Sequence, residues 1–281
     1  MPSPIPRRLI QTHKSRARLS KSERRWISTW LASNPTYEYL FFDDAACEDF
    51  VRTHFPQHWD AYSALPRAVE KADLFRYMAV LQLGGYYADT DTTCFRDLDA
   101  LAGAQDTCIV GVEHAFLDDQ EPSGVDRQYC QWFFGAVAGH PFLQELVQEV
   151  ADNARSGRDC SLPNRKFSAT TNKTGPVIFT RVANRHLNAI RVLPQAAFGT
   201  IPRTHEPWSP VINPTAVAQD VWVRHHFQGS WKMAGRRETR LMALVLMLVL
   251  LGVLWLLLRH LRRRRERLWT RRIREALCEP L

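Results

Sequence analysis

Two aspartates, Asp89 and Asp91, stand one residue apart directly after an apolar stretch that ends in Gly84 and Gly85 and two tyrosines. If an extended strand continues through them, both carboxylates project to one face, because alternate residues of a strand point the same way. Two carboxylates this close repel each other unless a positive group lies between them. A hard divalent cation with oxygen ligands satisfies that requirement. An isolated Asp-x-Asp pair is more often a solvated turn, but a place at the end of a strand favours a ligand site.

The pattern of apolar residues predicts alternating strands and helices around these aspartates. Strands are expected where bulky apolar residues alternate or run together, and helices where they recur at helical spacing. The expected strands cover residues 7–13, 37–44, 86–91, 108–114 and 131–139, and the expected helices cover residues 21–33, 47–55, 67–84, 141–154 and 176–187. Strands separated by helices indicate an α/β sandwich.

The net charge of the chain is concentrated near its C-terminal end. The 281 residues carry a formal charge of +8 and are 45% hydrophobic, which suits one large domain or two small ones. Nine arginines and three glutamates in residues 259–281 account for +6, so residues 1–258 carry only +2. A general nucleic-acid-binding surface is therefore not supported.

Residues 241–258 (LMALVLMLVLLGVLWLLL) form a run of 18 residues without a charged or strongly hydrogen-bonding side chain. As a helix they would measure about 27 Å, just long enough to cross a hydrocarbon core of roughly 30 Å with help from the flanks. They lack the polar stripe of a buried core helix. We predict a transmembrane helix here. The arginine-rich residues 259–281 then form a cytosolic tail, and the preceding domain lies outside the cytosol, by the positive-inside rule.

The other end of the sequence does not explain this orientation. Residues 1–20 lack an apolar core of about seven residues or more and do not read as a secretory signal peptide. Either a leader precedes this sequence, or the charge rule misleads here. Both alternatives stay open at this point.

Five ordered motifs carry a resemblance to glycosyltransferase family 32. They read IPRRLIQTHK (5–14), KADLFRYMAVLQLGGYYADTD (71–91), FFGAVAGHPFL (133–143), NKTGPVIFTR (172–181) and HHFQGSWK (225–232). The family includes initiating α-1,6-mannosyltransferases and the catalytic subunit of inositol phosphoceramide mannosyltransferase. The resemblance spans about residues 5 to 232. It implies an α/β fold with one GT-A-like, Rossmann-type nucleotide-sugar transferase domain over residues 1–235.

The resemblance also implies a donor-binding site. Asp73 and Arg76 are three residues apart on an expected helix and share a face, and a surface ion pair is the alternative for such a pair. In related sugar-nucleotide transferases this pair holds the donor sugar hydroxyls, and a guanidinium fork also suits a phosphate. The remaining expected donor contacts are Gln11, Thr12, Gly85, Tyr86, Thr174, Gly175, Trp231 and Lys232. Gln131 and the backbone of residues 132–135 are further candidates, with a buried strand as the alternative.

The last motif resembles the H-F-x-G-x-x-K ending of retaining transferases such as glycogenin, with His226 and Lys232 at its two ends. In those enzymes the imidazole joins the Asp-x-Asp carboxylates on manganese, and the lysine meets the diphosphate. The resemblance therefore implies Asp89, Asp91 and His226 as ligands of Mn²⁺ (or Mg²⁺), with His225 as the second choice. Oxygen and imidazole together suit manganese better than calcium.

The implied activity is a retaining, metal-dependent hexosyl transfer. Breaking the bond between the anomeric carbon and the nucleoside diphosphate leaves negative charge on the diphosphate, which the metal and Lys232 stabilise. A diphosphate oxygen can accept the proton of the attacking hydroxyl, so no general base is nominated. The expected catalytic residues are Asp89, Asp91, Arg76 and Lys232. GDP-mannose is the favoured donor. The acceptor is a glycan or glycolipid of the N-glycan or inositol phosphoceramide type, and membrane lipid is a further partner.

Three alternatives stay open. The first is a galactosyl- or N-acetylglucosaminyltransferase that uses a UDP donor. The second is a non-catalytic, membrane-anchored scaffold that binds sugar nucleotides, which the presence of Asp89, Asp91 and His226 disfavours. The third is a metal-dependent hydrolase, which is disfavoured because no nucleophile elbow or second acidic cluster accompanies the two aspartates. The location favoured by the sequence is a single-pass protein of the Golgi or endoplasmic reticulum with a lumenal catalytic domain.

Overall fold

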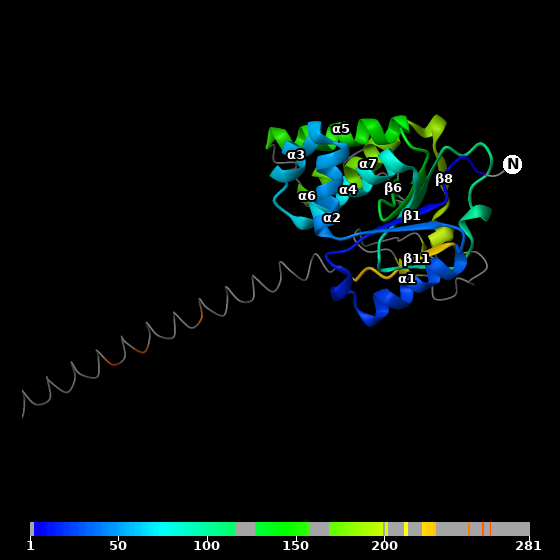
Figure 1. Ribbon diagram of the computed structural model, residues 1–281, viewed down its shortest axis with the longest axis horizontal. Coiled ribbons are helices and arrows are strands. Elements are labelled where there is room, and N and C mark those ends of the chain that lie inside the picture. The colour runs from blue at the N-terminus through cyan, green and yellow to red at the C-terminus, as the bar shows by residue number, and fades with distance from the viewer. Residues whose placement is uncertain are drawn as a thin grey trace, which may run out of the picture. The chain divides into compact units, whose positions relative to one another are not determined.

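The computed structural model describes residues 3–115, 127–157, 169–198, 200–201, 211–212 and 221–228, together with the single residues 247, 255 and 259. The chain divides into two units, residues 1–227 and 228–281. The first unit holds the fold (Figure 1).

A mixed β-sheet of seven strands forms the centre of the first unit. Its strands are β1 (Arg8–Thr12), β2 (Glu38–Phe42), β3 (Gly85–Ala88), β5 (Cys108–Ala115), β6 (Arg127–Tyr129), β7 (Phe133–Ala136) and β8 (Arg191–Leu193). Their order is β2-β1-β3-β7-β5-β6, and β8 pairs with β5. β1 runs parallel to β2 and β3, whereas β7 runs antiparallel to β3 and β5. The sheet is therefore mixed and not wholly parallel.

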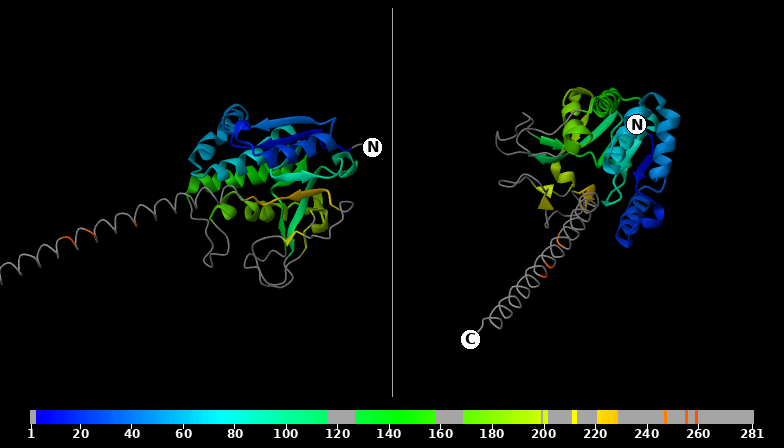
Figure 2. Two further views of the ribbon diagram at one scale, coloured as in Figure 1. Left: turned by 90° about the horizontal axis from the view of Figure 1, so that it is seen from below. Right: turned by 90° about the vertical axis from the view of Figure 1, so that its left-hand side faces the viewer.

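The two faces of the sheet carry different layers. One face is covered by α2 (Asp44–His54), α3 (Trp59–Ala64), α4 (Ala68–Leu83), α5 (Pro141–Ser156), α6 (Ala169–Lys173) and α7 (Pro176–Ala183) (Figure 1). The other face carries α1 (Lys21–Ser33) and a small antiparallel sheet of β4 (Thr92–Cys94) and β11 (Val223–His225). In the right-hand view of Figure 2 the blue helix α1 lies apart from the cyan and green helices.

Short elements complete the unit. They are the 3₁₀ helices η1 (Arg16–Arg18), η2 (Pro56–His58), η3 (Leu98–Ala100), η4 (Leu187–Ala189) and η5 (Gln195–Phe198), and the two-residue strands β9 (Thr200–Ile201) and β10 (Val211–Ile212).

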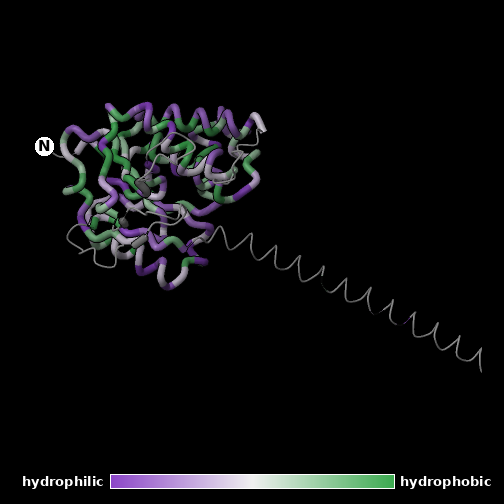
Figure 3. Tube along the Cα trace, turned by 180° about the vertical axis from the view of Figure 1, so that it is seen from behind, coloured by the Kyte–Doolittle hydropathy of each residue, from purple (hydrophilic) through white to green (hydrophobic). Residues whose placement is uncertain are grey.

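Alternating bulk along the central strands builds a core on each side of the sheet. Tyr87 and Phe134 belong to the cluster under α4, α5 and α7, whereas Tyr86 and Phe133 belong to the cluster on the α1 side. Successive strand side chains point to opposite faces, so an apolar run buries itself on both. Burying one such side chain contributes about 1.5–3 kcal/mol. Figure 3 shows hydrophobic segments inside the unit and hydrophilic ones along its outer helices.

Two glycines bring the end of α4 and the start of β3 close to Pro6 and to the start of β1. Gly84 and Gly85 have φ values of +65° and +108°, which only glycine adopts readily. A Cβ on Gly84 would lie 2.8 Å from Pro6 Cγ, and a Cβ on Gly85 would lie 2.6 Å from Arg8 Cβ. The chain therefore reverses directly from the C-terminal end of α4 into β3. The N-terminal half of α4 then lies beside the C-terminal end of β3.

The structure confirms the expected α/β architecture and corrects one local prediction. The predicted helix over residues 21–33 is α1, where Ser20 and Glu23 form a capping box. The strand predicted to continue through Asp91 ends at Ala88, and Asp89 to Asp91 form a turn before β4. A short strand such as β4 was not predicted, because three residues show no usable periodicity.

Among the residues that the structure describes, no helix is long and apolar enough to cross a membrane. The predicted span, residues 241–258, falls outside the described residues except at Met247 and Trp255, and the predicted tail does so except at Arg259. The span and the tail stay predictions.

Candidate functional site

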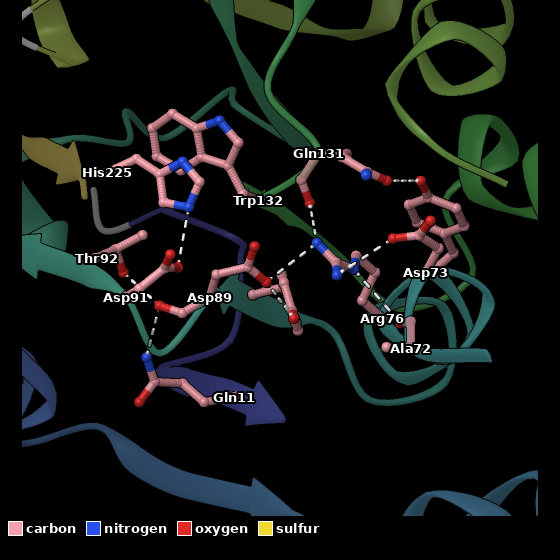
Figure 4. A network of polar contacts seen from close by, with 12 residues as sticks. Gln11, Ala72, Asp73, Arg76, Asp89, Asp91, Thr92, Gln131, Trp132 and His225 are labelled. Carbon is pink, nitrogen blue, oxygen red and sulfur yellow. Dashed lines mark hydrogen bonds and ion pairs between the residues drawn. The ribbon is translucent and has the colours of Figure 1, made fainter. Parts of the chain in front are cut away.

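The turn between β3 and β4 carries both aspartates and is held from three sides. The Asp89 backbone N–H donates to the carbonyl of Trp132 at 2.9 Å. The Asp89 carbonyl accepts from Gln11 Nε2 at 3.3 Å and from Thr92 Oγ1 at 2.5 Å (Figure 4). β1, β4 and the segment before β7 thus fix this turn, although it is no longer part of a strand. Asp89 and Asp91 keep a defined geometry without the strand that the sequence predicted.

Arg76 joins the carboxylates of Asp73 and Asp89 in a row beside the turn, in which Asp73 and Arg76 are buried and Asp89 is partly exposed. Its Nη1 lies 3.1 Å from Asp89 Oδ1, and its Nη2 lies 3.3 Å from Asp73 Oδ1. Only 7% of the Arg76 side chain is exposed. Tyr87 donates its hydroxyl to Asp89 Oδ1 at 2.6 Å, and Thr174 donates its hydroxyl to Asp73 Oδ2 at 2.9 Å. The predicted shared helix face is confirmed, and it faces the interior of the site and not the solvent (Figure 4).

Asp89, Asp91 and His225 form a group whose ligand atoms all lie within 4.8 Å of one another. His225 Nε2 lies 2.9 Å from Asp91 Oδ1. The register of β11 against β4 places His225 opposite Thr92, the first residue after the turn. A strand from the end of the unit therefore brings an imidazole to the aspartates across more than 130 residues of sequence.

His226 lies beside the turn, but its ring points toward α1 and not toward the carboxylates. Its backbone N–H donates to the Asp91 carbonyl at 2.9 Å. Its ring stacks on Trp26 at 4.1 Å between centroids with 9° between planes, and its Nε2 lies 2.7 Å from Thr93 Oγ1. Neighbouring residues of an extended chain point to opposite sides, so one of the tandem histidines meets the carboxylates and the other packs on α1. The geometry favours His225, the second choice of the sequence analysis, over His226.

The residues present fit a divalent cation. Both contacts of Asp89 with Arg76 and Tyr87 fall on Oδ1, and among the described residues no hydrogen bond or ion pair is recorded at Oδ2. The hydrogen bond between His225 and Asp91 can give way to a metal, because an imidazole proton and a metal ion compete for the same nitrogen. Two carboxylates and one imidazole form a donor set that suits manganese.

Burial shapes the protonation of the row. It raises the pKa of Asp73 to about 7, although the positive charge of Arg76 opposes the shift. Burial alone would lower the pKa of Arg76. Electrostatic interactions with Asp89, Tyr87 and Asp73 outweigh this effect and raise the pKa above its ordinary value, so the guanidinium stays charged. Burial also raises the pKa of the Tyr87 hydroxyl well above its ordinary value, which keeps it a hydrogen-bond donor. The row thus combines one permanent cation with a carboxyl group that titrates near neutral pH.

Two expected nucleotide contacts, Gln11 and Thr12, lie at the carboxyl end of β1, beside that of β2. Gln11 is buried, and its Oε1 accepts from the Tyr39 hydroxyl at 3.0 Å. Thr12 donates its hydroxyl to the Phe42 carbonyl at 3.0 Å. Gln11 also bonds the aspartate turn, so this edge connects directly to the candidate metal ligands.

The other expected donor contacts lie at different places in the fold. Gly85 provides close packing of β3 on β1, as described above. Tyr86 is buried in the α1-side core, where its ring stacks on Phe133 at 6.2 Å. Tyr87, which the sequence analysis did not select, is the tyrosine that reaches Asp89. The choice between adjacent tyrosines depends on which face of the sheet the site occupies, and the sequence does not show that.

Thr174 and Gly175 stand between α6 and α7 next to the row. The Thr174 carbonyl accepts from the Tyr77 hydroxyl at 2.8 Å, and Gly175 is the N-cap residue of α7. Thr174 contacts Asp73 through its hydroxyl, and the predicted contacts of Thr174 and Gly175 with the donor stay predictions. Trp231 and Lys232 lie outside the described residues.

The segment before β7 completes the site. The Gln131 carbonyl accepts from Arg76 Nη1 at 3.2 Å, and the Gln131 side chain accepts from Tyr77. The indole of Trp132 stacks on His225 with 4.7 Å between centroids and 19° between planes. Gln131 was a candidate from the sequence. The indole contact was not predicted, because nothing in the local sequence relates Trp132 to a histidine 93 positions later.

Comparisons with known proteins indicate a glycosyltransferase. The family described as "Glycosyltransferase sugar-binding region containing DXD motif" matches residues 20–108, which include Asp73, Arg76, Asp89 and Asp91. The comparisons thereby support the resemblance that the motifs predicted.

Several curated relatives are mannosyltransferases by name. The "Initiation-specific alpha-1,6-mannosyltransferase" of Candida albicans is 25% identical over 84% of this chain and 74% of that protein. The protein of the same name from Schizosaccharomyces pombe is 29% identical over 66% of this chain and 49% of that protein. "Inositol phosphoceramide mannosyltransferase 3" of S. pombe is 28% identical over 52% of this chain and 37% of that protein. The chain thus spans about half or less of the last two.

The fold is also similar to that of a solved structure. The "PaToxG Glycosyltransferase" structure superposes with a TM-score of 0.50 at 15% identity, covering 66% of this chain and 72% of that one. This likeness supports the predicted GT-A-like fold.

Proposed function

We propose that this chain, a glycosyltransferase that resembles family 32, transfers mannose from GDP-mannose to a hydroxyl group with retention of configuration and with the help of a divalent cation. The observation that carries the proposal is the continuous polar row from Asp73 through Arg76 to Asp89, Asp91 and His225. A sugar nucleotide needs such a site, because its hydroxyls and its diphosphate must be held at the same time.

The row offers different chemistry at its two ends. Asp73 and Arg76 are suited to sugar hydroxyls, since a buried carboxylate accepts and a guanidinium donates several hydrogen bonds. Asp89, Asp91 and His225 would hold the cation at the other end, and the sequence motif assigns Lys232 to the diphosphate. A bound Mn²⁺ would act as a Lewis acid that neutralises charge on the leaving diphosphate.

The edge formed by β1 and β2 supports a nucleoside site next to this row. Tyr39 and Phe41 are half-buried, and the Arg16 guanidinium lies 4.3 Å from the centroid of the Phe41 ring. Tyr39 also bonds Gln11, which bonds the aspartate turn. An aromatic surface with amide and guanidinium donors suits a base and ribose, and it lies at the carboxyl ends of parallel strands, where α/β sheets bind ligands.

The acceptor and the location are part of the proposal. The names of the relatives favour a glycan or an inositol phosphoceramide head group as acceptor. The apolar run over residues 241–258 supports a single-pass membrane protein, which would keep the site near a lipid acceptor. We place the catalytic unit in the lumen of the Golgi or endoplasmic reticulum, on the strength of the arginine-rich residues 259–281.

One experiment tests the reaction and identifies the acceptor class. The full chain in detergent is incubated with GDP-[¹⁴C]mannose and Mn²⁺, once with an oligomannoside and once with a membrane lipid extract. The expected result is a labelled product with an α-mannosidic bond that EDTA prevents from forming. Parallel incubations contain labelled UDP-sugars. Labelled product from these donors alone would reject the mannose donor, and label transfer that is unaffected by EDTA would reject the metal.

A further inference from the structure

Trp132 contacts both the turn that carries Asp89 and the ring of His225. Its backbone carbonyl accepts the Asp89 N–H at 2.9 Å, and its indole stacks on His225. The side chain is almost fully buried, with a relative exposure of 3%. One residue therefore fixes the turn that carries the carboxylates and also faces the imidazole that completes the group (Figure 4).

His225 lacks the hydrogen bond that usually orients a metal-binding imidazole. A metal-ligating histidine commonly donates its second ring N–H to a carboxylate or carbonyl, which fixes the ring. In the part of the chain that the structure describes, Nδ1 of His225 is buried and has no hydrogen-bond partner. Its ring is instead enclosed by aromatic side chains, with the Trp132 face on one side and the Phe227 ring at a centroid distance of 4.0 Å.

Phe227 adopts a backbone conformation that this enclosure explains. Its φ of +47° is the only positive φ among the described non-glycine residues. A left-handed conformation costs a non-glycine residue roughly 1–2 kcal/mol, and such strain persists where surrounding contacts determine it. The Phe227 ring meets the His225 ring at 65° and lies 6.4 Å from the Trp132 ring. The segment directly after β11 thus places a second aromatic ring against the imidazole.

A buried carboxylate fixes the indole itself. Trp132 Nε1 donates to Glu113 Oε1 at 3.1 Å, and Gln128 Nε2 donates to Glu113 Oε2 at 2.8 Å. Glu113 is 8% exposed and lies on β5, next to β6, which carries Gln128. A hydrogen bond to an ionised acceptor is stronger and more directional than one to a neutral group, so the indole plane is set by the central sheet.

We propose that Glu113 and Trp132 are positioning residues that orient His225 toward Asp91 through the stacked rings, in place of a hydrogen bond to Nδ1. The inference rests on the proposed function only for the presence of a cation at Asp89, Asp91 and His225. The sheet acts on the imidazole in three steps: Gln128 aligns Glu113, Glu113 fixes the Trp132 indole, and the indole holds the ring so that Nε2 faces the carboxylates.

Binding of Mn²⁺ alone tests the proposal without any sugar nucleotide. Free Mn²⁺ is measured by electron paramagnetic resonance during titration of the full chain in detergent. Trp132→Phe keeps an aromatic ring and removes the N–H, and it should weaken Mn²⁺ binding about tenfold, as loss of an outer contact of a metal ligand commonly does. Glu113→Gln should weaken binding in the same direction. Exchanging the pair, Glu113→Gln with Gln128→Glu, restores one carboxylate and one amide and should recover part of the loss.

Trp59→Phe is the matched control, because it makes the same substitution on α3, where Trp59 packs against Arg52 away from the aspartates. It should leave the Mn²⁺ Kd unchanged. Melting temperatures of all variants separate a weakened site from a weakened fold. Wild-type Mn²⁺ affinity in folded Trp132→Phe, or an equal loss in Trp59→Phe, would overturn the proposal.

A double-mutant cycle tests whether Trp132 acts through His225. In a His225→Asn background, Trp132→Phe should cause little further loss of Mn²⁺ affinity, because the group that the indole orients is gone. A full additional loss would contradict the proposed route. The result does not depend on the donor: a chain that binds Mn²⁺ as described and uses no mannose would refute the proposed function and leave this inference intact.

Discussion

Arg76→Lys keeps the positive charge of the site and removes the fork that joins Asp73 to Asp89. In the wild type, Nη1 forms an ion pair with Asp89 and Nη2 forms one with Asp73. A single ammonium group cannot occupy both positions, so at least one of the two ion pairs is lost, and leaving a buried charged group without its partner costs roughly 1–3 kcal/mol or more. Since the same row is proposed to hold the donor sugar, we expect kcat/KM for GDP-mannose to fall roughly a hundredfold, which corresponds to about 2.7 kcal/mol.

Arg155→Lys provides the matched control. Arg155 also forks between two carboxylates, with Nε 2.8 Å from Asp60 Oδ2 and Nη1 3.2 Å from Asp152 Oδ1. It lies on α5 at the surface, where ion pairs contribute about 0–1 kcal/mol, so its kcat/KM should stay within twofold of the wild type. Circular dichroism melting checks that both variants are folded. A folded Arg76→Lys variant with wild-type kcat/KM would refute the role of the row in donor binding.

Asp91→Ala should abolish transfer and Mn²⁺ binding while the melting temperature changes little, because Asp91 lies in a turn and not in a core; unchanged turnover at saturating Mn²⁺ would contradict the site. Burial raises the pKa of Asp73 to about 7, above its unfolded value of about 3.9. The folded chain therefore binds more protons than the unfolded chain between these values, so this carboxyl makes the protein less stable as pH rises from about 4 to about 7. Asp73→Asn should remove that trend in chemical denaturation, and an identical pH profile in the variant would contradict the shift. Cutting the chain after Arg240 should yield a soluble fragment that still uses its donor; aggregation of the fragment alone would place residues 241–258 in the core of the catalytic unit.

Local sequence features predicted the elements that depend on local chemistry. The capping residue Ser20 marks the start of α1, Pro176 is the first residue of α7, and Gly84 ends α4. The alternation of bulky residues predicted β1 and β2, because that pattern also depends only on neighbouring residues. Asp73 and Arg76 were predicted to share a face because helical spacing requires it.

Other features depend on contacts between segments that are distant in the sequence, and local sequence patterns do not predict those contacts. The predicted strand through Asp91 was wrong because the chain leaves the sheet at Ala88 to begin β4, a pairing partner of β11. The register of that pair decides which tandem histidine faces the carboxylates, and a shift of one residue would exchange His225 and His226. Glu113 was not selected because its partners come from neighbouring strands and the segment before β7.

The donor preference is the most direct test of the proposed function. kcat/KM is measured for GDP-mannose, UDP-galactose and UDP-glucose with one acceptor and saturating Mn²⁺. Asp89, Asp91 and His225 are proposed to act on the diphosphate, which all three donors share. Selection between the donors therefore depends on Asp73, Arg76 and the edge of the sheet near Gln11. A site that hydrogen-bonds particular hydroxyls rejects an epimer that orients one of them differently, because its own polar groups are then left unpaired. We predict that GDP-mannose is used at least roughly tenfold more efficiently, a difference of about 1.4 kcal/mol in transition-state binding. A UDP-sugar with the highest kcat/KM would contradict the mannosyltransferase assignment.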